Sequence, residues 1–300
     1  MNRRDFLQSG LALTAGTMLP SFVAAPGFSI QFMATDWGFN GTADEFCRAA
    51  KKEGYDGVEV WWPQDAAAQE KLFDALDKHQ LQVGFLCGGW QADAQEHLQT
   101  FKKAIQAASS NSRKKPLYIN CHSGRDYFSF EENLSFIRFT TETTKQTGIP
   151  VYHETHRGRM CYSAPVTRKF LEAVPEMRLT LDISHWCTVH ESLLADQAAT
   201  LNLALARAEH IHARIGHPEG PQVNDPRAPE WENTVKQHLS WWDTIINRKK
   251  QKGESMTVLT EFGPADYMPT LPYTRQPLAN QWEINVYMMR LLKARYLGGH

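Results

Sequence analysis

Val151-Tyr152-His153-Glu154 and Leu179-Thr180-Leu181-Asp182-Ile183 are two short apolar runs, and each carries a carboxylate at or near its C-terminal end. Between them, Thr167–Ala173 has the spacing of an amphipathic helix. Two strand-like runs separated by a helical stretch predict a βαβ unit with parallel strands. Such strands are covered on both faces, which explains why they are apolar almost throughout.

The same alternation continues along the chain in both directions. Eight apolar runs are expected as strands: Phe28–Ala34, Gly57–Trp62, Leu81–Cys87, Leu117–Cys121, Val151–Glu154, Leu179–Ile183, His210–Ile215 and Thr257–Phe262. Helical patterns are expected at Ala43–Glu53, Ala66–His79, Ala94–Ala108, Phe130–Thr147, Thr167–Ala173, Ser192–Ala208, Glu232–Lys249 and Leu278–Leu297. Eight strand–helix units in about 270 residues predict an α/β protein with a single (β/α)8 TIM barrel over residues 28–300. An open doubly wound sheet is disfavoured, because no glycine-rich turn follows the first strand.

Residues 1–27 have the features of an export signal. The pair Arg3-Arg4 is followed by Phe6-Leu7, by an apolar run over 11–23 and by the small residues Ala24-Ala25. This order resembles a twin-arginine signal peptide, and the apolar run is too short for a stable membrane span. We therefore expect a periplasmic protein. The chain has five cysteines, an odd number without C-x-x-C spacing, so neither a disulfide framework nor a zinc knuckle is expected.

Acidic and histidine side chains at the ends of four consecutive late strands predict a metal site. The set is Glu154, Asp182, His212 and Glu261. Functional residues of such barrels lie at the C-terminal ends of strands. Buried carboxylates in one small ring repel one another unless a cation offsets them. Three carboxylates with one imidazole favour one divalent ion, Mn2+ or Mg2+ in preference to Co2+ or Zn2+. His210 shares a face with His212, but His212 is nearer the strand end and is preferred as the ligand.

The residues at these strand ends resemble the xylose isomerase-like barrels, in particular the sugar isomerase and epimerase branch that includes ketose 3-epimerases and inosose dehydratase. The resemblance covers about residues 28–297 and rests on Tyr55-Asp56-Gly57-Val58-Glu59, Glu154, Asp182-x-x-His185, His212-Ala213-Arg214 and Glu261-Phe262. It implies that the four residues of the metal site are the ligands. It also implies that Glu154 and Glu261 act as acid and base, and that His185 contacts the substrate.

Further polar and aromatic side chains at or just beyond the strand ends are expected to bind the substrate. Charged groups and histidines suit sugar hydroxyls, and tryptophan rings suit the C–H face of a sugar. With His185, the expected set is Arg214, Glu59, His122, His156, Arg157, Trp37, Trp62 and Trp186. Arg159 is expected in a loop. The loops after the last two strands contain prolines, which lack an N–H, together with Glu219 and Asp266, so an unphosphorylated sugar is expected.

The expected activity is a metal-dependent sugar isomerase or epimerase that removes a proton next to a carbonyl and passes through an enediolate. A lyase or dehydratase acting on keto-sugars or inososes would use the same proton abstraction. A non-catalytic periplasmic sugar-binding barrel is the alternative from another class. An abasic-site endonuclease, which uses the same barrel, is disfavoured because the formal net charge is −1 and no nucleic-acid partner is expected. The sequence leaves a homo-oligomer open.

The expected signal can be tested by replacing Arg3 and Arg4 with lysine together. The export receptor reads the arginine pair itself, so the double variant should stay in the cytoplasm while the unaltered chain reaches the periplasm. Immunoblots of periplasmic and cytoplasmic fractions measure the distribution. An unchanged periplasmic yield would show that this segment is not a twin-arginine signal.

Overall fold

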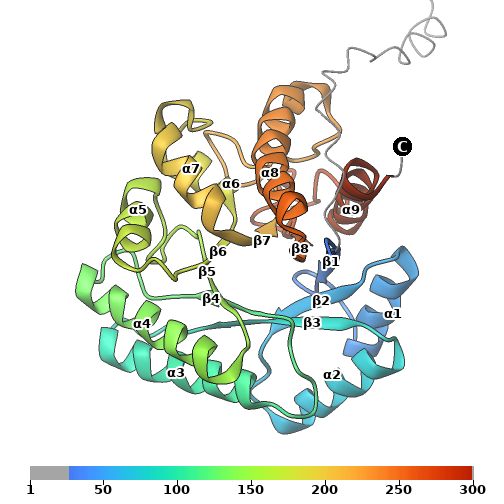
Figure 1. The fold of residues 1–300 in the computed structure, drawn as a ribbon. Helices are drawn as coiled ribbons and strands as arrows, with labels where there is room; N and C mark the ends of the chain where they lie inside the picture. Colours follow the sequence, from blue (N-terminus) through green and yellow to red (C-terminus); the bar gives the residue numbers. More distant parts are fainter. Residues whose placement is uncertain (1–26, 299–300) are drawn as a thin grey trace, which may run out of the picture.

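The computed structural model describes residues 27–298, so residues 1–26, with nearly all of the expected export signal, lie outside the described residues. Eight parallel strands close into a barrel in sequence order, and the helices form a ring around it (Figure 1). The predicted (β/α)8 barrel is therefore confirmed. The strands are β1 Ile30–Thr35, β2 Gly57–Trp61, β3 Gln82–Gly88, β4 Ile119–His122, β5 Val151–Glu154, β6 Leu179–Leu181, β7 Ala208–His212 and β8 Met256–Thr260.

The helices alternate with these strands along the chain. They are α1 Ala43–Glu53, α2 Ala66–Lys78, α3 Ala94–Ser110, α4 Phe130–Thr147, α5 Ala164–Ala173, α6 Ile183–Val189, α7 Ala198–Arg207, α8 Glu232–Lys252 and α9 Gln281–Leu297, with short 3-10 turns η1 Ala195–Gln197 and η2 Pro229–Trp231. Among residues 27–298, no helix combines the length and hydropathy that crossing a membrane requires. The five cysteines are all buried and unpaired, as expected from their spacing.

Helix boundaries match the predicted ones where the sequence carries strong caps. Thr42 and Ser129 each form a capping box with a glutamate three residues later, and α1 and α4 begin directly after them. Gly54 and Gly148 end the same two helices in the left-handed conformation, which glycine adopts without strain. Both helices therefore have the bounds predicted from the sequence.

The region after β6 differs from the prediction. The run expected as a strand to Ile183 stops at Leu181, and the short helix α6 begins at Ile183. Asp182 is the N-cap of α6, and its side chain accepts a hydrogen bond from the Ser184 backbone N–H. The missed helix is shorter than two turns, and its first residue, Ile183, is apolar, so it reads as a continuation of the strand.

Buried neutral histidines connect the barrel to its helices. His153 on β5 contacts the Ser123 hydroxyl through Nδ1 (2.6 Å) and the Thr140 hydroxyl on α4 through Nε2 (2.8 Å). The His238 Nδ1–H of α8 donates to the Thr234 carbonyl, and its Nε2 accepts from the Gly216 N–H in the loop after β7. Burial lowers the pKa of His153 to about 3 and that of His238 to about 4. Protonation of His238 would remove the acceptor that holds Gly216.

These pKa shifts predict that acid destabilises the protein. A histidine kept neutral in the folded state binds its proton first in the unfolded state, so its stabilising contribution is complete above about pH 6.5 and is lost as pH falls toward about 4. From pH 7 to pH 5 each of the two histidines should lower the free energy of unfolding by about 2 kcal/mol. Urea unfolding of metal-free protein at both pH values measures this. His238→Gln should remove about half of the pair's contribution, and an identical pH dependence in the variant would contradict the assignment.

Candidate metal centre and active-site cavity

Four of the predicted residues converge at the C-terminal end of the barrel. Glu154 and His212 are the last residues of β5 and β7, Asp182 follows β6 and Glu261 follows β8. Each offers one ligand atom, and these atoms all lie within 4.8 Å of one another. All four side chains are buried, with Asp182 and His212 fully so. Neighbouring strand ends of a closed barrel place residues that are far apart in sequence around one point.

The chemistry of this group fits a divalent cation. His212 Nδ1 and Glu261 Oε2 are 2.8 Å apart, yet neither atom has an aligned hydrogen-bond partner. Burial lowers the pKa of His212, but Glu261 and Glu154 outweigh it and hold that pKa well above its ordinary value. Burial raises the pKa of Asp182 to about 6. The group therefore favours additional positive charge at its centre, and three carboxylates with one imidazole nitrogen suit Mn2+ or Mg2+.

Arg214 is the buried cation of this group. Its Nη2 lies against Asp182 Oδ2 and 3.4 Å from Glu261 Oε2, and it donates to His185 Nε2 at 3.0 Å. Its Nε donates to the Ser184 hydroxyl. The acids Asp182 and Glu261 raise its pKa despite burial, which alone would lower it. Arg214 therefore offsets the charge of these acids as well as lining the cavity.

A second layer of polar residues lies behind the ligands. Glu59 on β2 is buried, with Oε1 3.2 Å from His212 Nε2 and Oε2 3.1 Å from His210 Nε2. The Asn120 amide donates to Glu154 at 2.8 Å and to Glu59 at 3.2 Å. With Nε2 directed at Glu59, His212 presents Nδ1 to Glu261 and Glu154. Glu59 was predicted to bind substrate, and the structure pairs it with these histidines at the edge of the cavity.

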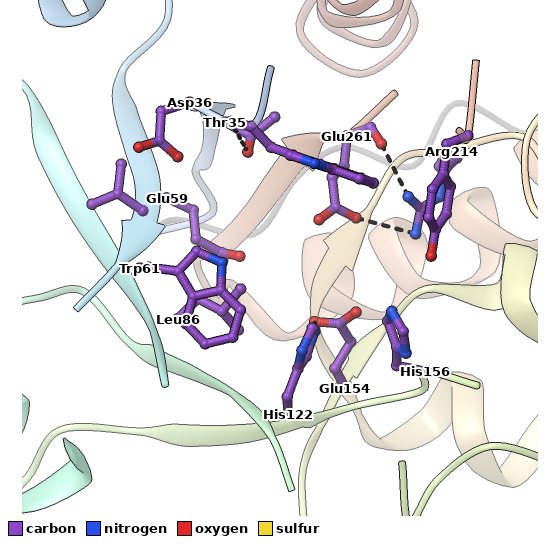
Figure 2. A pocket seen from close by; sticks show the side chains of 13 residues that line it. Thr35, Asp36, Glu59, Trp61, Leu86, His122, Glu154, His156, Arg214 and Glu261 are labelled. Atoms are coloured by element: carbon purple, nitrogen blue, oxygen red, sulfur yellow. Dashed lines mark hydrogen bonds and ion pairs between the residues drawn. The ribbon is translucent and has the colours of Figure 1, made fainter. Parts of the chain in front are cut away.

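Above these four residues is a cavity open to solvent, with about 640 Å3 of empty space when its open mouth is included. Figure 2 shows Glu154 and Glu261 turned into it from opposite sides, with Arg214 and His156 on one flank and Glu59 and Trp61 on the other. The lining residues are Thr35, Asp36, Trp37, Glu59, Val60, Trp61, Leu86, His122, Glu154, His156, Arg214, Glu261 and Tyr267. The His122 Nε2 lies 3.1 Å from Glu154 Oε2. The floor of the cavity is therefore polar, and its walls are largely aromatic.

The sequence profile of the xylose isomerase-like TIM barrel family matches residues 47–241, well over half of the chain. The protein belongs to this family. No curated protein matches the sequence. Its place in the family agrees with the closed barrel of eight parallel strands.

Solved structures with the same fold include enzymes and a metal complex. The 3-keto-D-glucoside 4-epimerase of E. coli superposes with a TM-score of 0.60 at 14% identity, over 89% of this chain and 100% of that one. A probable 3-DHS dehydratase from Bacillus anthracis gives 0.55 at 16% identity, with coverage of 89% and 100%. A xylose isomerase-like barrel protein from Mycobacterium smegmatis in complex with magnesium gives 0.57 at 11% identity, with coverage of 88% and 97%. At these identities the likeness shows the fold.

Most of the residues predicted to bind substrate lie in or beside the cavity. Trp37, His122, His156 and Arg214 line it. His185 is fully buried on α6, where its ring lies 4.0 Å from that of His156. The Arg157 guanidinium lies 4.9 Å from the ring centre of Tyr267, a lining residue that the sequence did not single out.

Two tryptophans predicted for the substrate site belong instead to the core. Trp62 is buried against Phe73 and Phe85, because adjacent strand residues face opposite sides; Trp61 lines the cavity. Trp186 is fully buried on α6, and its Nε1 donates to the Cys161 carbonyl. Alternation from Glu59 would have identified Trp61, since residues two apart share a face.

Arg159 and Asn120 make contacts that the sequence did not predict. Arg159 lies in the loop after β5, as expected, but its side chain is buried and its Nη1 donates to the Gly89 carbonyl. Asn120 was not selected, although an amide inside an apolar strand is a signal of a buried polar contact.

The ligand set predicts that Glu154→Gln or Asp182→Asn strips the metal while the barrel still folds. An amide oxygen is a weaker ligand than a carboxylate, and either change removes one negative charge from the group. Mn2+ should raise the midpoint of thermal unfolding of the unaltered protein but not of the variants. Plasma mass spectrometry measures bound metal and circular dichroism measures the fold. Glu230→Gln, at an exposed position, is the matched control. Full metal occupancy in both site variants would overturn the assignment.

Proposed function

We propose that this protein is a divalent-metal-dependent sugar isomerase or epimerase that removes a proton from the carbon next to a carbonyl. The observation that supports it is the placement of two buried carboxylates, Glu154 and Glu261, on opposite sides of one cavity and in one ligand group (Figure 2). To invert a substrate carbon, one group must remove a proton from one face of that carbon and another group must return a proton to the opposite face.

Glu154 is in the ionised form that accepting a proton requires. Burial would raise its pKa, but His122 and His212 hold it well below its ordinary value, so the side chain is a carboxylate. When bound, the divalent ion would polarise the carbonyl and offset the charge that develops on its oxygen. Glu154, Asp182, His212 and Glu261 would hold that ion. Arg214 adds a fixed positive charge, and the rings of Trp37 and Tyr267 form part of the cavity wall.

The two glutamates can divide the proton transfer between them. One takes the proton, and the other returns one to the opposite face, which gives epimerisation. Return to the neighbouring carbon gives an aldose–ketose isomerisation. A lyase is the second candidate, because His122 lines the cavity beside Glu154 and offers a further group that can supply a proton to a leaving oxygen. A non-catalytic sugar-binding barrel would not need buried acids that repel one another.

The cavity favours an unphosphorylated substrate. Among its described lining residues, Arg214 is the only lysine or arginine, and Asp182 and Glu261 already engage it. Asp36, Glu59, Glu154 and Glu261 line the same cavity and would repel a phosphate dianion. The substrate class we propose is therefore a neutral sugar or keto-sugar. This agrees with the periplasmic location proposed from the N-terminal residues.

Deuterium exchange tests the proposed reaction. The Mn2+-loaded protein is incubated in deuterated water with free aldoses, ketoses, keto-sugars and their phosphates, and deuterium on carbon is measured by NMR. We expect exchange next to the carbonyl of an unphosphorylated sugar, because the base returns a solvent-derived proton. Glu154→Gln and Glu261→Gln should each reduce it by at least about a hundredfold, the usual contribution of a general acid or base.

Glu230→Gln is the control and should exchange at the rate of the unaltered protein. Exchange in sugar phosphates alone would disprove the proposed substrate class. Product formation with loss of water or of a glycosyl group would identify the lyase. Sugar binding without exchange or turnover in the metal-loaded protein would disprove the proposed enzymatic activity.

A further inference from the structure

We propose that Trp61 and Trp90 form an outer subsite that stacks a second sugar ring, so that the substrate is a disaccharide or another glycoside rather than a free monosaccharide. This inference rests on the proposed function and specifies its substrate class. The pair is called the tryptophan shelf below.

The shelf is unusual because both rings are exposed. Trp61 is 41% exposed and Trp90 is 62% exposed, whereas Trp62, Trp186, Trp241 and Trp242 are buried. The ring centres of Trp61 and Trp90 are 5.8 Å apart with the planes tilted by 42°. Trp61 ends β2 and Trp90 lies just beyond β3, so both are at the end of the barrel where the cavity opens. Adjacent exposed aromatic rings at a cavity mouth mark a binding surface.

Buried and partly exposed arginines hold Trp90 in place. The Arg159 guanidinium lies 4.3 Å from the centre of the Trp90 ring, and its Nη1 donates to the Gly89 carbonyl. The Arg125 guanidinium is 5.9 Å from the same ring centre and donates to the Trp90 carbonyl at 3.0 Å. Arg159 is only 3% exposed, and among the described residues no carboxylate forms an ion pair or hydrogen bond with it. Burying an unpaired arginine is unfavourable, so its use as a support for Trp90 indicates a functional requirement.

The shelf is continuous with the reactive end of the cavity. Glu154 contacts His122 at 3.1 Å, and the His122 ring lies edge-on to Trp61 with the centres 5.3 Å apart. Trp61 itself lines the cavity and Trp90 does not. A sugar whose reacting carbon lies between Glu154 and Glu261 would therefore extend one further ring over the shelf.

A sugar ring matches the chemistry of this surface better than an apolar group does. An indole face packs against the C–H face of a pyranose, while the surrounding groups must bind hydroxyls. Arg125, which donates to the Trp90 carbonyl, and the exposed Tyr127, whose hydroxyl donates to the Ala92 carbonyl, both follow β4. Gln91 follows Trp90 directly. These polar neighbours can bind the equatorial hydroxyls of a ring stacked on the indoles. The occupant is therefore a second pyranose of the same substrate.

Calorimetry with matched sugars tests the subsite in the full, Mn2+-loaded protein. The probes are fructose against lactulose and glucose against cellobiose, each also as its keto-sugar, because in each pair the second member adds one pyranose. We expect one disaccharide to bind at least about tenfold more tightly than its monosaccharide. Trp90→Ala should abolish that difference. It should leave monosaccharide affinity and monosaccharide deuterium exchange unchanged, because Trp90 does not line the cavity.

Trp90→Phe keeps an aromatic ring and should retain part of the preference. Tyr273→Ala removes a fully exposed aromatic from the loop after β8 and should change neither affinity. Equal affinity for both members of every pair would overturn the subsite, as would an equal loss of affinity for both members in Trp90→Ala. The proposed function would still stand in either case if monosaccharides exchange deuterium. Absence of binding and exchange with every sugar would overturn both.

Discussion

Mutual repulsion of buried carboxylates is the constraint on which the functional end of this barrel depends. Glu154, Asp182 and Glu261 lie within a few ångströms of one another, and Glu59 lies directly behind them. Each is a charge removed from water, which is unfavourable unless a cation or hydrogen-bond donor compensates it. Arg214, His212, His210 and Asn120 supply that compensation within the chain. A divalent ion would complete it.

This constraint explains the arrangement of the second layer. Glu59 Oε1 lies 3.2 Å from Nε2 of His212, while Nδ1 of the same ring faces Glu261 and Glu154. Asn120 on β4 donates to Glu59 on β2 and to Glu154 on β5, so one side chain connects three strands. The layer restricts the orientation of the ligands before any ion binds. Because these side chains are already oriented, they do not have to reorganise when an ion binds or when charge develops on a substrate oxygen.

The cavity divides into a deep polar end and an outer aromatic end. The deep end contains ionisable side chains of the cavity, among them Glu154, Glu261, Arg214, His122 and His156. These are groups that can transfer protons or stabilise charge. The outer end contains Trp61 with Trp90 beyond it on one side, and Trp37 with Tyr267 on the other. Structures with the same barrel at 11–16% identity include an epimerase and a probable dehydratase. Since the barrel is common to them, differences in reaction and substrate must reside in such side chains and loops.

The sequence by itself determined the barrel, and it also predicted the four residues that the structure brings together in one group able to hold a metal ion. The strand–helix alternation is a local property, and helices with strong caps, such as α1 and α4, were predicted to the residue. Glu154, Asp182, His212 and Glu261 were identifiable because each is an ionisable residue at the end of an apolar run, and closure of a barrel brings such ends together.

The tertiary structure alone decided which neighbouring side chains face the cavity. Trp61 rather than Trp62 lines it, and Trp186 is in the core because α6 replaces the expected end of β6. The burial of Arg159 against Trp90 and the contacts of Asn120 with Glu59 and Glu154 join segments distant in sequence. Local periodicity reports which residues are apolar and how they are spaced. The direction and partner of a polar side chain depend on strand register and loop packing, which arise only when distant segments meet.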